Sequence, residues 1–462
     1  MIDRILIQTG LRRDRVAGMA GDRLVELAVL EHRETLPVDS ICLGRVRRVA
    51  QELDAAFVDL DGQRDGMLAG RDAPGGRRRP LNARVHEGQA LLVQLRRLTR
   101  DDKGPRLTAR PQLAGRCLVF QPDGSEPQLS GRITGGGRRR QLTALLAELC
   151  PAGEGAFTAR TSAAEASDDM LRAEAGKLRA QWQEIGAEAG RARPPAVLWR
   201  PDPLHQVLAT LLTPAVVSIE LSEQAAVPRL RALLQTLAPF ALDRLAVHRS
   251  GETLFEASGV EAQIETAQGI RVALPSGGWL AIEPTTALTA IDVNAGAVDA
   301  AVSAGRVAIV TNLEAAQAIA DQLRLRDIGG IVVIDFMRMH GRGESRRLME
   351  AFDAALSEDR AEVRLLGPSE LGLVEMTRQR LGLSPAMRGE VDGIDAALER
   401  AMALAQSGAG HSLALHAAPG RLDSLADTVA DLCESFRDRT GCSLNLLPEP
   451  GYADDRIEVR PA

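Results

Sequence analysis

Short runs of alternating hydrophobic and polar residues dominate the first part of the chain. Two of them, RILIQTG and RLVELAVLE, predict a hairpin with a charged turn between them. Further apolar runs follow, separated by turns rich in glycine and aspartate. Five short strands within roughly eighty residues are typical of a small closed barrel of the OB type. We therefore expect such a barrel over residues 38–118.

Helical patterns become frequent in the middle of the chain. The stretch ITGGGRRRQL is interpreted as a basic, flexible loop, and a long helix is expected from about Asp168 to Ala189. The prolines of RARPPAVLWRPDP predict a linker. From Leu204 to Glu265 helices and strands alternate, which favours an α/β unit.

Strongly apolar strands return after residue 268. GGWLAIEPTTALTAIDVNAG predicts two strands around a Glu-Pro turn. The segment TNLEAAQAIADQLRLRDIGG predicts an amphipathic helix, which Asn312 can cap and which Gly329 and Gly330 end. The buried strand IVVIDFMRM then ends in Asp335. The last block, residues 390–462, has the order helix, strand, helix, strand and predicts a small α/β domain.

Polar side chains stand at the ends of two of these apolar strands. Asp292 and Asn294 are two residues apart, so they share one face of a strand, and Asp335 ends the other strand. A strand–helix–strand unit brings the ends of its two strands to a common crevice. Two carboxylates there suit Mg²⁺, which takes few protein ligands and keeps several waters. An aspartate at a strand end is also a common turn former, so this pattern alone leaves both readings open.

Charge is unevenly distributed along the chain. Residues 1–140 carry 26 Lys and Arg against 18 Asp and Glu, although the whole chain has a net charge of −6. A basic N-terminal third indicates a polyanionic partner, and an ordinary solvated surface explains it equally well. None of the five cysteines forms a C-x-x-C pair, so they are interpreted as buried, reduced thiols. No signal peptide or membrane-length apolar run is seen, and we expect a cytoplasmic protein.

Several long segments resemble one family. TALTAIDVNAG, TNLEAAQAIADQLRLRDIGGIVVIDFMRM and GLVEMTRQRLGLSP closely resemble the catalytic region of the ribonuclease E/G family. GRVRRVAQELDAAFVDLDGQRDGML is similar to the RNA-binding barrel inserted in that family, and FTARTSAAEAS to its 5′-end sensor. The last block resembles its small dimerisation domain.

The resemblance implies an α/β multidomain architecture. An RNase H-like subdomain would be interrupted by the OB-type barrel and the sensor region, and a DNase I-like catalytic subdomain and the small α/β domain would follow. The expected ranges are 1–37 with 204–268 for the RNase H-like subdomain, 38–118 for the barrel, 119–203 for the sensor, 269–389 for the catalytic subdomain and 390–462 for the C-terminal domain.

The resemblance also implies a metal-dependent endoribonuclease that cleaves AU-rich single-stranded RNA in RNA processing or decay. The products would carry a 5′-phosphate and a 3′-hydroxyl. Mg²⁺, with Mn²⁺ as an alternative, would be held by Asp292 and Asp335, and Asn294 would orient the attacking water or the scissile phosphate. The RNA-binding residues would be Phe57, Met67, Lys103 and Arg106, and the 5′-phosphate would be held by Arg160 and Thr161.

Three features depart from the family pattern. The two cysteines of its zinc link are missing between the catalytic and small domains, so we expect no zinc, and a homodimer through the C-terminal domain remains an alternative to a monomer. Arg338 stands where an aspartate is usual. No long scaffold tail follows, so assembly through such a tail is not expected. The alternative function is therefore an RNA-binding protein of the same fold with weak or no catalytic activity.

Overall fold

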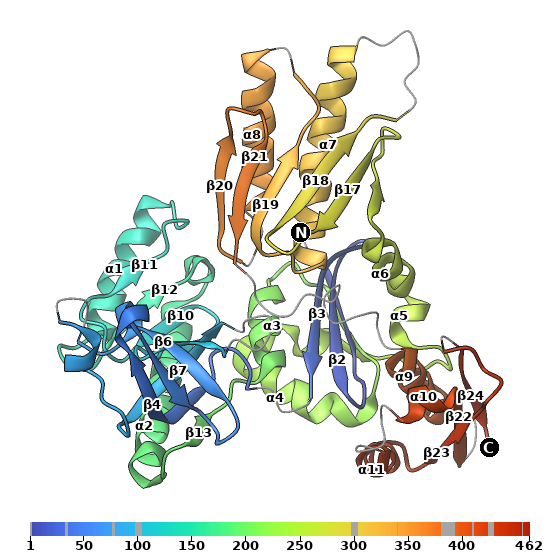
Figure 1. Ribbon diagram of the computed structural model, residues 1–462, viewed down its shortest axis with the longest axis horizontal. Helices are drawn as coiled ribbons and strands as arrows, with labels where there is room; N and C mark the ends of the chain where they lie inside the picture. Colours follow the sequence, from blue (N-terminus) through green and yellow to red (C-terminus); the bar gives the residue numbers. More distant parts are fainter. Residues whose placement is uncertain are drawn as a thin grey trace. The chain divides into compact units, whose positions relative to one another are not determined.

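The computed structural model divides into two compact units (Figure 1). One is Glu34–Thr210, and the other combines Met1–Arg33 with Leu211–Ala462. The structure describes residues 2–32, 36–75, 79–97, 104–296, 304–339, 341–357, 359, 361–379, 393–408, 411–423, 429–454 and 456–462. Within these residues, no helix is long and apolar enough to cross a membrane.

A closed five-stranded barrel forms the first half of the unit Glu34–Thr210. Its strands are β4 (Ile41–Ala50), β5 (Ala55–Asp59), β6 (Asp65–Ala69), β7 (Ala90–Arg97) and β8 (Arg106–Thr108). They pair in the order β4-β5-β6-β8-β7, and β7 pairs back with β4, so no edge is left open. Only β6 and β8 are parallel among these pairs. The expected barrel is confirmed, and its topology is consistent with an OB-type fold.

Three single-turn 3-10 helices join the barrel strands: η1 (Gln51–Leu53), η2 (Gly70–Asp72) and η3 (Leu81–Ala83). Inward-facing aliphatic side chains fill the barrel, among them Val46, Val58, Leu68 and Val93. They alternate along each strand with residues that face outward, as a closed barrel requires.

A second layer follows the barrel in the same unit. A four-stranded sheet has the order β11-β12-β10-β9, and its strands are β9 (Leu113–Ala114), β10 (Leu118–Gln121), β11 (Gln128–Leu129) and β12 (Ala156–Ala159). The helices α1 (Gly136–Leu149) and α2 (Asp168–Arg191) share a hydrophobic core with it. Helix α2 confirms the expected long helix, and the side chain of Ser167 caps it by accepting from the backbone N–H of Met170.

Two sequence interpretations in this region are wrong. The glycine- and arginine-rich stretch expected to be a loop forms the first turns of α1. Arg138 explains this, because its Nε donates to the Ala164 carbonyl (3.1 Å) and its Nη1 to Asp168 (3.0 Å). The proline-rich linker contains β13 (Ala196–Trp199), which pairs antiparallel with β4 and returns the chain to the barrel.

A mixed five-stranded sheet organises the start of the second unit. Its order is β15-β14-β1-β2-β3, with β1 (Arg4–Gln8), β2 (Arg13–Ala20), β3 (Arg23–Glu31), β14 (Ser218–Leu221) and β15 (Leu245–Val247). Strands β1 and β14 are parallel, as are β14 and β15, whereas β1, β2 and β3 form an antiparallel meander. The helices of this part of the unit are η5 (Gln224–Ala226), α4 (Val227–Leu237), η6 (Pro239–Arg244), α5 (Leu254–Ala257) and α6 (Val260–Gln268). Helix α3 (Pro203–Leu211) is the last element of the unit Glu34–Thr210, apart from its final residue.

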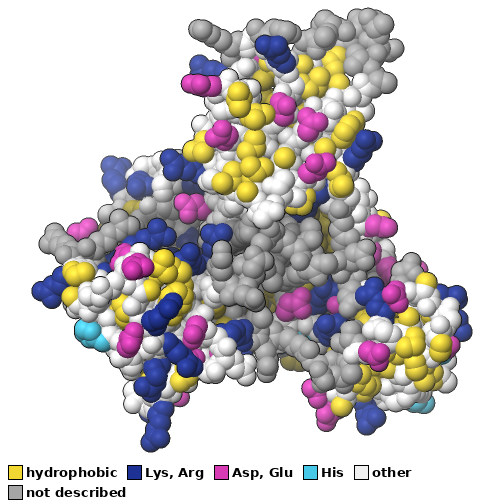
Figure 2. Space-filling model, viewed as in Figure 1, with side chains coloured by type: hydrophobic (Ala, Val, Ile, Leu, Met, Phe, Trp, Pro, Cys, Tyr) yellow, Lys and Arg dark blue, Asp and Glu magenta, His cyan; other side chains and the backbone are white. Residues whose placement is uncertain are grey.

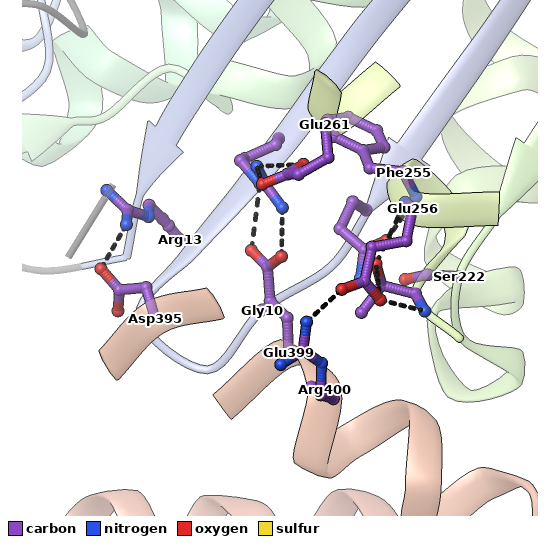
Figure 3. Close-up of polar contacts among 12 residues, drawn as sticks. Gly10, Arg13, Ser222, Phe255, Glu256, Glu261, Asp395, Glu399 and Arg400 are labelled. Carbon is purple, nitrogen blue, oxygen red and sulfur yellow. Dashed lines mark hydrogen bonds and ion pairs between the residues drawn. The ribbon is translucent and has the colours of Figure 1, made fainter. Parts of the chain in front are cut away.

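The predicted charged turn between RILIQTG and RLVELAVLE is wrong, because those residues are strand β2. Its charged side chains are buried and paired with residues distant in sequence. Arg15 is 2% exposed, donates through Nε to Glu399 (3.1 Å) and through Nη1 to both oxygens of Glu261 (2.9 and 3.0 Å). Arg13 forms an ion pair with Asp395 (Figure 3). A sequence pattern does not reveal partners this distant, so it predicts a solvated turn where the structure has a buried strand.

Two of these three acidic partners, Asp395 and Glu399, lie on α9 (Gly393–Gln406), the first helix of the C-terminal segment. The rest of that segment comprises β22 (Ser412–Ala417), α10 (Pro419–Asp423), α11 (Val429–Thr440), β23 (Ser443–Pro448) and β24 (Ile457–Pro461). The expected order of helices and strands is confirmed, with β24 as an addition that pairs antiparallel with β22. Leu11 packs into the core of this segment, so the segment is attached to β2 by apolar contact as well as by charge.

The remaining sheet has six strands in the order β16-β17-β18-β19-β21-β20. They are β16 (Arg271–Ala273), β17 (Trp279–Pro284), β18 (Leu288–Asn294), β19 (Gly330–Asp335), β20 (Val363–Pro368) and β21 (Val374–Arg378). Helices α7 (Ala304–Leu325) and α8 (Arg342–Leu356) share one hydrophobic core with this sheet. The expected hairpin around the Glu-Pro turn and the strand ending at Asp335 are confirmed.

The ends of α7 differ from the sequence prediction. The helix begins before Asn312, so Asn312 is not its cap but a fully buried residue inside it. At the other end Asp327, not a glycine, has positive φ (45°), and the N–H of Ile328 reaches back to the Leu323 carbonyl. The Asp327 carboxylate accepts from buried Arg378, which fixes this turn against β21. The likeness to RNase H and DNase I subdomains and the five expected domain ranges stay predictions.

The paired charges of β2 yield a stability prediction. Replacing Arg15 with Met leaves Glu399 buried without its cation, which should lower the free energy of unfolding by about 3–5 kcal/mol. Replacing Arg15 and Glu399 together with Met removes both buried charges and should restore much of that loss. Urea unfolding followed by circular dichroism measures both effects.

Arg346→Met is the matched control for this experiment. Arg346 forms an exposed i,i+4 pair with Glu350, so its loss should cost no more than about 0.5 kcal/mol. The single variant Glu399→Met completes the comparison. If the loss of unfolding free energy in the double variant equals the sum of the losses in Arg15→Met and Glu399→Met, the buried pair is not the source of the effect.

Candidate active site and nucleic-acid interface

The two candidate aspartates are direct neighbours in the six-stranded sheet. Strands β18 and β19 are parallel, and their register places Asp292 opposite Asp335. Ile291, Val293 and Ile334, which alternate with these residues, point into the core beneath the helices. Both aspartates therefore point to the opposite, open face, where both are exposed. Adjacent strands lie about 4.8 Å apart, so two carboxylates in register can reach one bound ion.

Asn294 belongs to the same site. Its amide Nδ2 donates to Oδ2 of Asp292 over 2.9 Å. This hydrogen bond restricts the Asp292 carboxylate to one orientation and leaves its other oxygen free of Asn294. The sequence placed these two side chains on one face of the strand, and the structure brings them into contact.

Asn312 supports the site from behind, a role that sequence reasoning missed. Its Nδ2 donates to the carbonyl of Met337 (2.8 Å), and its Oδ1 accepts from the N–H of the same residue (3.0 Å). These two bonds hold the backbone two residues after Asp335 against helix α7. A polar residue in the middle of an apolar helical stretch was the available signal, because a buried amide needs partners.

The donor set at Asp292 and Asp335 fits a hard divalent cation with a large share of water ligands. Two carboxylates in register and an amide beside them are the oxygen-rich, partly open set that Mg²⁺ accepts. A search of the described part of the chain finds no cluster of three or more His, Cys, Asp or Glu side chains suited to a metal. Arg338, three residues beyond Asp335, is exposed.

The open face of the sheet carries acidic and hydrophobic side chains together (Figure 2). Ile331, on β19, is 51% exposed, and Glu283 of β17 is exposed as well. Exposed acids along this face disfavour an approaching polyanion unless a cation is present, which agrees with a metal-dependent site.

The predicted RNA-binding residues of the barrel form one row across its outer surface. Strand register pairs Phe57 with Met67, and Met67 with Arg106. Phe57 is half-buried and absent from the barrel core, so it faces outward and is not an interior residue. Nη1 of Arg106 lies 2.8 Å from the sulfur of Met67. Lys103, the fourth predicted residue, lies outside the described residues.

Arg48 extends this row, and the sequence analysis did not identify it. It is paired in register with Phe57, and its guanidinium carbon lies 4.9 Å from the centre of the Phe57 ring. Arg48 and Arg106 are both exposed. The row Arg48–Phe57–Met67–Arg106 therefore offers an apolar strip with a cation at each end.

The predicted phosphate-binding pair lies at the end of β12. Arg160 precedes the short 3-10 helix η4 (Thr161–Ala164), and its Nη1 donates to the Gly115 carbonyl (2.9 Å). The hydroxyl of Thr161 is exposed and lies 3.3 Å from that of Ser130. The hydrogen bond from Nη1 to Gly115 thus fixes the side chain of Arg160. Thr161, the next residue, is exposed at the surface.

The prediction of buried thiols is confirmed for three of the five cysteines, whereas Cys150 and Cys433 are partly exposed. All five are free, and Cys42, Cys117 and Cys442 are buried. Burial raises the pKa of Cys42 to about 12, so its thiol stays protonated at neutral pH.

Comparison with known proteins agrees with these features. A model of the ribonuclease E/G family matches residues 112–381. Ribonuclease E of a Nostoc species is 36% identical over 373 residues, which are 78% of this chain and 53% of that protein. For ribonuclease E of a Synechocystis species the identity is 34% over 370 residues, 78% and 54% of the two chains. The chain thus spans about half the length of these two relatives.

Ribonuclease G of Escherichia coli is matched over more of its length. It is 32% identical over 393 residues, which cover 82% of this chain and 80% of the relative. The family model covers residues 119–203, where the sensor is predicted, and the strands that carry Asp292 and Asp335. This chain therefore belongs to the ribonuclease E/G family.

Proposed function

We propose that this protein is a metal-dependent endoribonuclease that hydrolyses single-stranded RNA. The observation that supports this most directly is the register of β18 and β19, which sets Asp292 beside Asp335 on an open sheet face. Family membership supports the same reaction, since the relatives are named ribonuclease E and ribonuclease G. Preference for AU-rich RNA, and products with a 5′-phosphate and a 3′-hydroxyl, are proposed on the family resemblance.

Asp292 and Asp335 would hold the metal, with Mg²⁺ preferred and Mn²⁺ as an alternative. A divalent cation bound there polarises a phosphoryl oxygen and lowers the pKa of a bound water. Asn294 keeps the Asp292 carboxylate in one orientation through its 2.9 Å hydrogen bond. Asn312 keeps the end of β19 in place. No zinc is proposed.

RNA would be guided by the barrel row. RNA bases stack on exposed aromatic rings, and each stacked base contributes roughly 1–3 kcal/mol to binding. Phe57, beside the flexible side chain of Met67, would provide such a ring. Arg48 and Arg106 at the ends of the row would contact phosphates, as would Lys103. At the sensor, Arg160 and Thr161 would bind a 5′-monophosphate through charge-assisted hydrogen bonds.

The alternative is an RNA-binding protein with weak or no catalytic activity. Arg338 favours it, because a cation three residues after Asp335 opposes binding of a divalent metal. Action in RNA processing or decay, a cytoplasmic location and a homodimer formed through the C-terminal domain stay predictions.

The metal site leads to the first functional prediction. Asp292→Asn and Asp335→Asn should each lower cleavage of a labelled, AU-rich oligonucleotide by more than about 100-fold, since even outer-shell partners of metals contribute 10–100-fold. RNA binding by both variants should stay within a few-fold of that of the wild type. Removal of divalent ions with EDTA should abolish cleavage, and added Mg²⁺ should restore it.

Glu283→Gln is the matched control for the aspartate variants. Glu283 is an exposed acid on the same sheet face, on the neighbouring strand β17, and its loss should not lower cleavage. If wild type and variants all bind RNA and none cuts it, the protein is an RNA-binding protein and the enzymatic proposal is wrong.

The sensor pair leads to a separate prediction. The wild type should cleave a 5′-monophosphorylated oligonucleotide faster than its 5′-hydroxyl counterpart, and Arg160→Ala should bring that rate ratio to about one. Arg172→Ala is the control, because Arg172 is an exposed arginine of α2 that pairs with Glu148. A ratio that Arg160→Ala does not change would contradict a 5′-phosphate site at Arg160.

A further inference from the structure

A second polar group lies in the same row of the sheet as the candidate metal site. Register pairs Arg271 of β16 with Ala281 of β17, and Ala281 with Asp292. The row therefore runs Arg271–Ala281–Asp292–Asp335 across four adjacent strands. Val272, the neighbour of Arg271, packs against the core, so Arg271 points to the open face that carries the two aspartates.

Trp279 holds Arg271 in a defined place on that face. Trp279 is opposite Asn294 in register and half-buried, and its neighbour Leu280 points into the core. The guanidinium carbon of Arg271 lies 4.2 Å from the centre of the Trp279 ring. This is a close cation–π contact, and it restrains a side chain that would otherwise move freely.

Arg271 has no acidic partner among the residues that the structure describes. Other arginines of this unit contrast with it: Arg15 and Arg378 are buried, and each is bound by two carboxylates. Arg271 is exposed, and its guanidinium contacts the tryptophan ring. An arginine stacked on an aromatic ring keeps its in-plane N–H groups free, and these match the oxygens of a phosphate.

We propose that Arg271, held by Trp279, binds a phosphate of the RNA next to the scissile one. This inference rests on the proposed function. Arg271 is two strand spacings from Asp292, about 10 Å between backbones, so it stands beside the metal site and not within it. The phosphate is favoured over a base because Arg271 brings a positive charge and in-plane N–H groups to the exposed face of the sheet. Arg271 and Trp279 are thus substrate-positioning residues on the β16 side of the cut.

A test uses oligonucleotides in which a single phosphate near the cleavage site is replaced by a neutral methylphosphonate. With the wild type, a methylphosphonate at one position next to the scissile phosphate should raise KM by about tenfold. This is the effect of losing one charge-assisted hydrogen-bonded contact. Arg271→Ala should raise KM on the unmodified RNA by a similar factor, with kcat changed less than twofold. The KM of the Arg271→Ala variant should also no longer change when the phosphate at that one position is replaced by a methylphosphonate.

Salt dependence gives an independent readout. Loss of one phosphate contact should reduce the slope of log Kd against log salt by about 0.7 for single-stranded RNA. Trp279→Ala should reproduce part of the Arg271→Ala effect, and Trp279→Tyr, which keeps an aromatic face, should retain wild-type behaviour. Circular dichroism and the thermal midpoint of each variant show whether β16 still folds onto the sheet.

Arg364→Ala is the matched control. Arg364 is exposed on β20 of the same sheet. Its row in the sheet runs through Thr377 to Ile331, which lies four residues before Asp335 on β19, so Arg364 is distant from the candidate metal site. It should leave KM, salt slope and methylphosphonate sensitivity unchanged.

Binding measured on the same oligonucleotides without Mg²⁺ separates the two proposals. If the wild type binds RNA but never cuts it, the endonuclease proposal fails, and the salt slope and methylphosphonate effects on Kd still decide the role of Arg271. The inference is wrong if the wild type cleaves RNA and a folded Arg271→Ala variant keeps the wild-type KM, salt slope and methylphosphonate sensitivity. The contact of Arg271 with Trp279 would then only shield the edge of the sheet from water.

Discussion

Burial of one face of the six-stranded sheet against α7 and α8 is the interaction on which the candidate chemistry depends. Residues at every second position, such as Ile291, Val293 and Ile334, are removed from water by these helices. The positions between them must then face outward, and Asp292, Asn294 and Asp335 occupy those positions. A one-residue slip of β18 would bury both of its polar side chains, so hydrophobic packing enforces the register that assembles the site. The same alternation places Arg271 and Trp279 on the open face.

Buried charge has a different role elsewhere in this unit. Arg15 on β2 pairs with Glu399 and Glu261, and Arg13 forms an ion pair with Asp395. Removing such groups from water costs free energy that their pairing largely offsets, so they contribute little net stability. A buried arginine without its acid is strongly unfavourable, however. The pairs therefore restrict where helix α9 can sit on the sheet, and Leu11 adds the apolar contact.

Most strand and helix positions could be predicted from local sequence patterns. The predictions that failed did so for one reason, which is that the residues concerned have partners distant in sequence. The barrel strands, helix α2 and the strands ending at Asn294 and Asp335 carry clear alternation or periodicity. Strand β2 and the first turns of α1 do not, because their arginines are stabilised by acids or carbonyl groups far along the chain. Asn312 looks like a cap in the sequence, and only the strand beside it shows that its amide holds the Met337 backbone. Propensity describes the residue and its neighbours in sequence, whereas these residues are determined by neighbours in space.

Local sequence patterns were sufficient to predict that Asp292 and Asn294 share a strand face and that Asp335 ends a second apolar strand, and the chain as a whole resembles one family. Those conclusions follow from a two-residue period and from long matching segments, which are properties of contiguous chain. The fold in three dimensions adds that Asp292 lies opposite Asp335, that Phe57 faces outward beside Arg48, and that Arg271 stacks on Trp279. Strand register and side-chain partnership are relations between segments tens to hundreds of residues apart. They are fixed by which faces can be buried together, and a linear pattern carries no record of that.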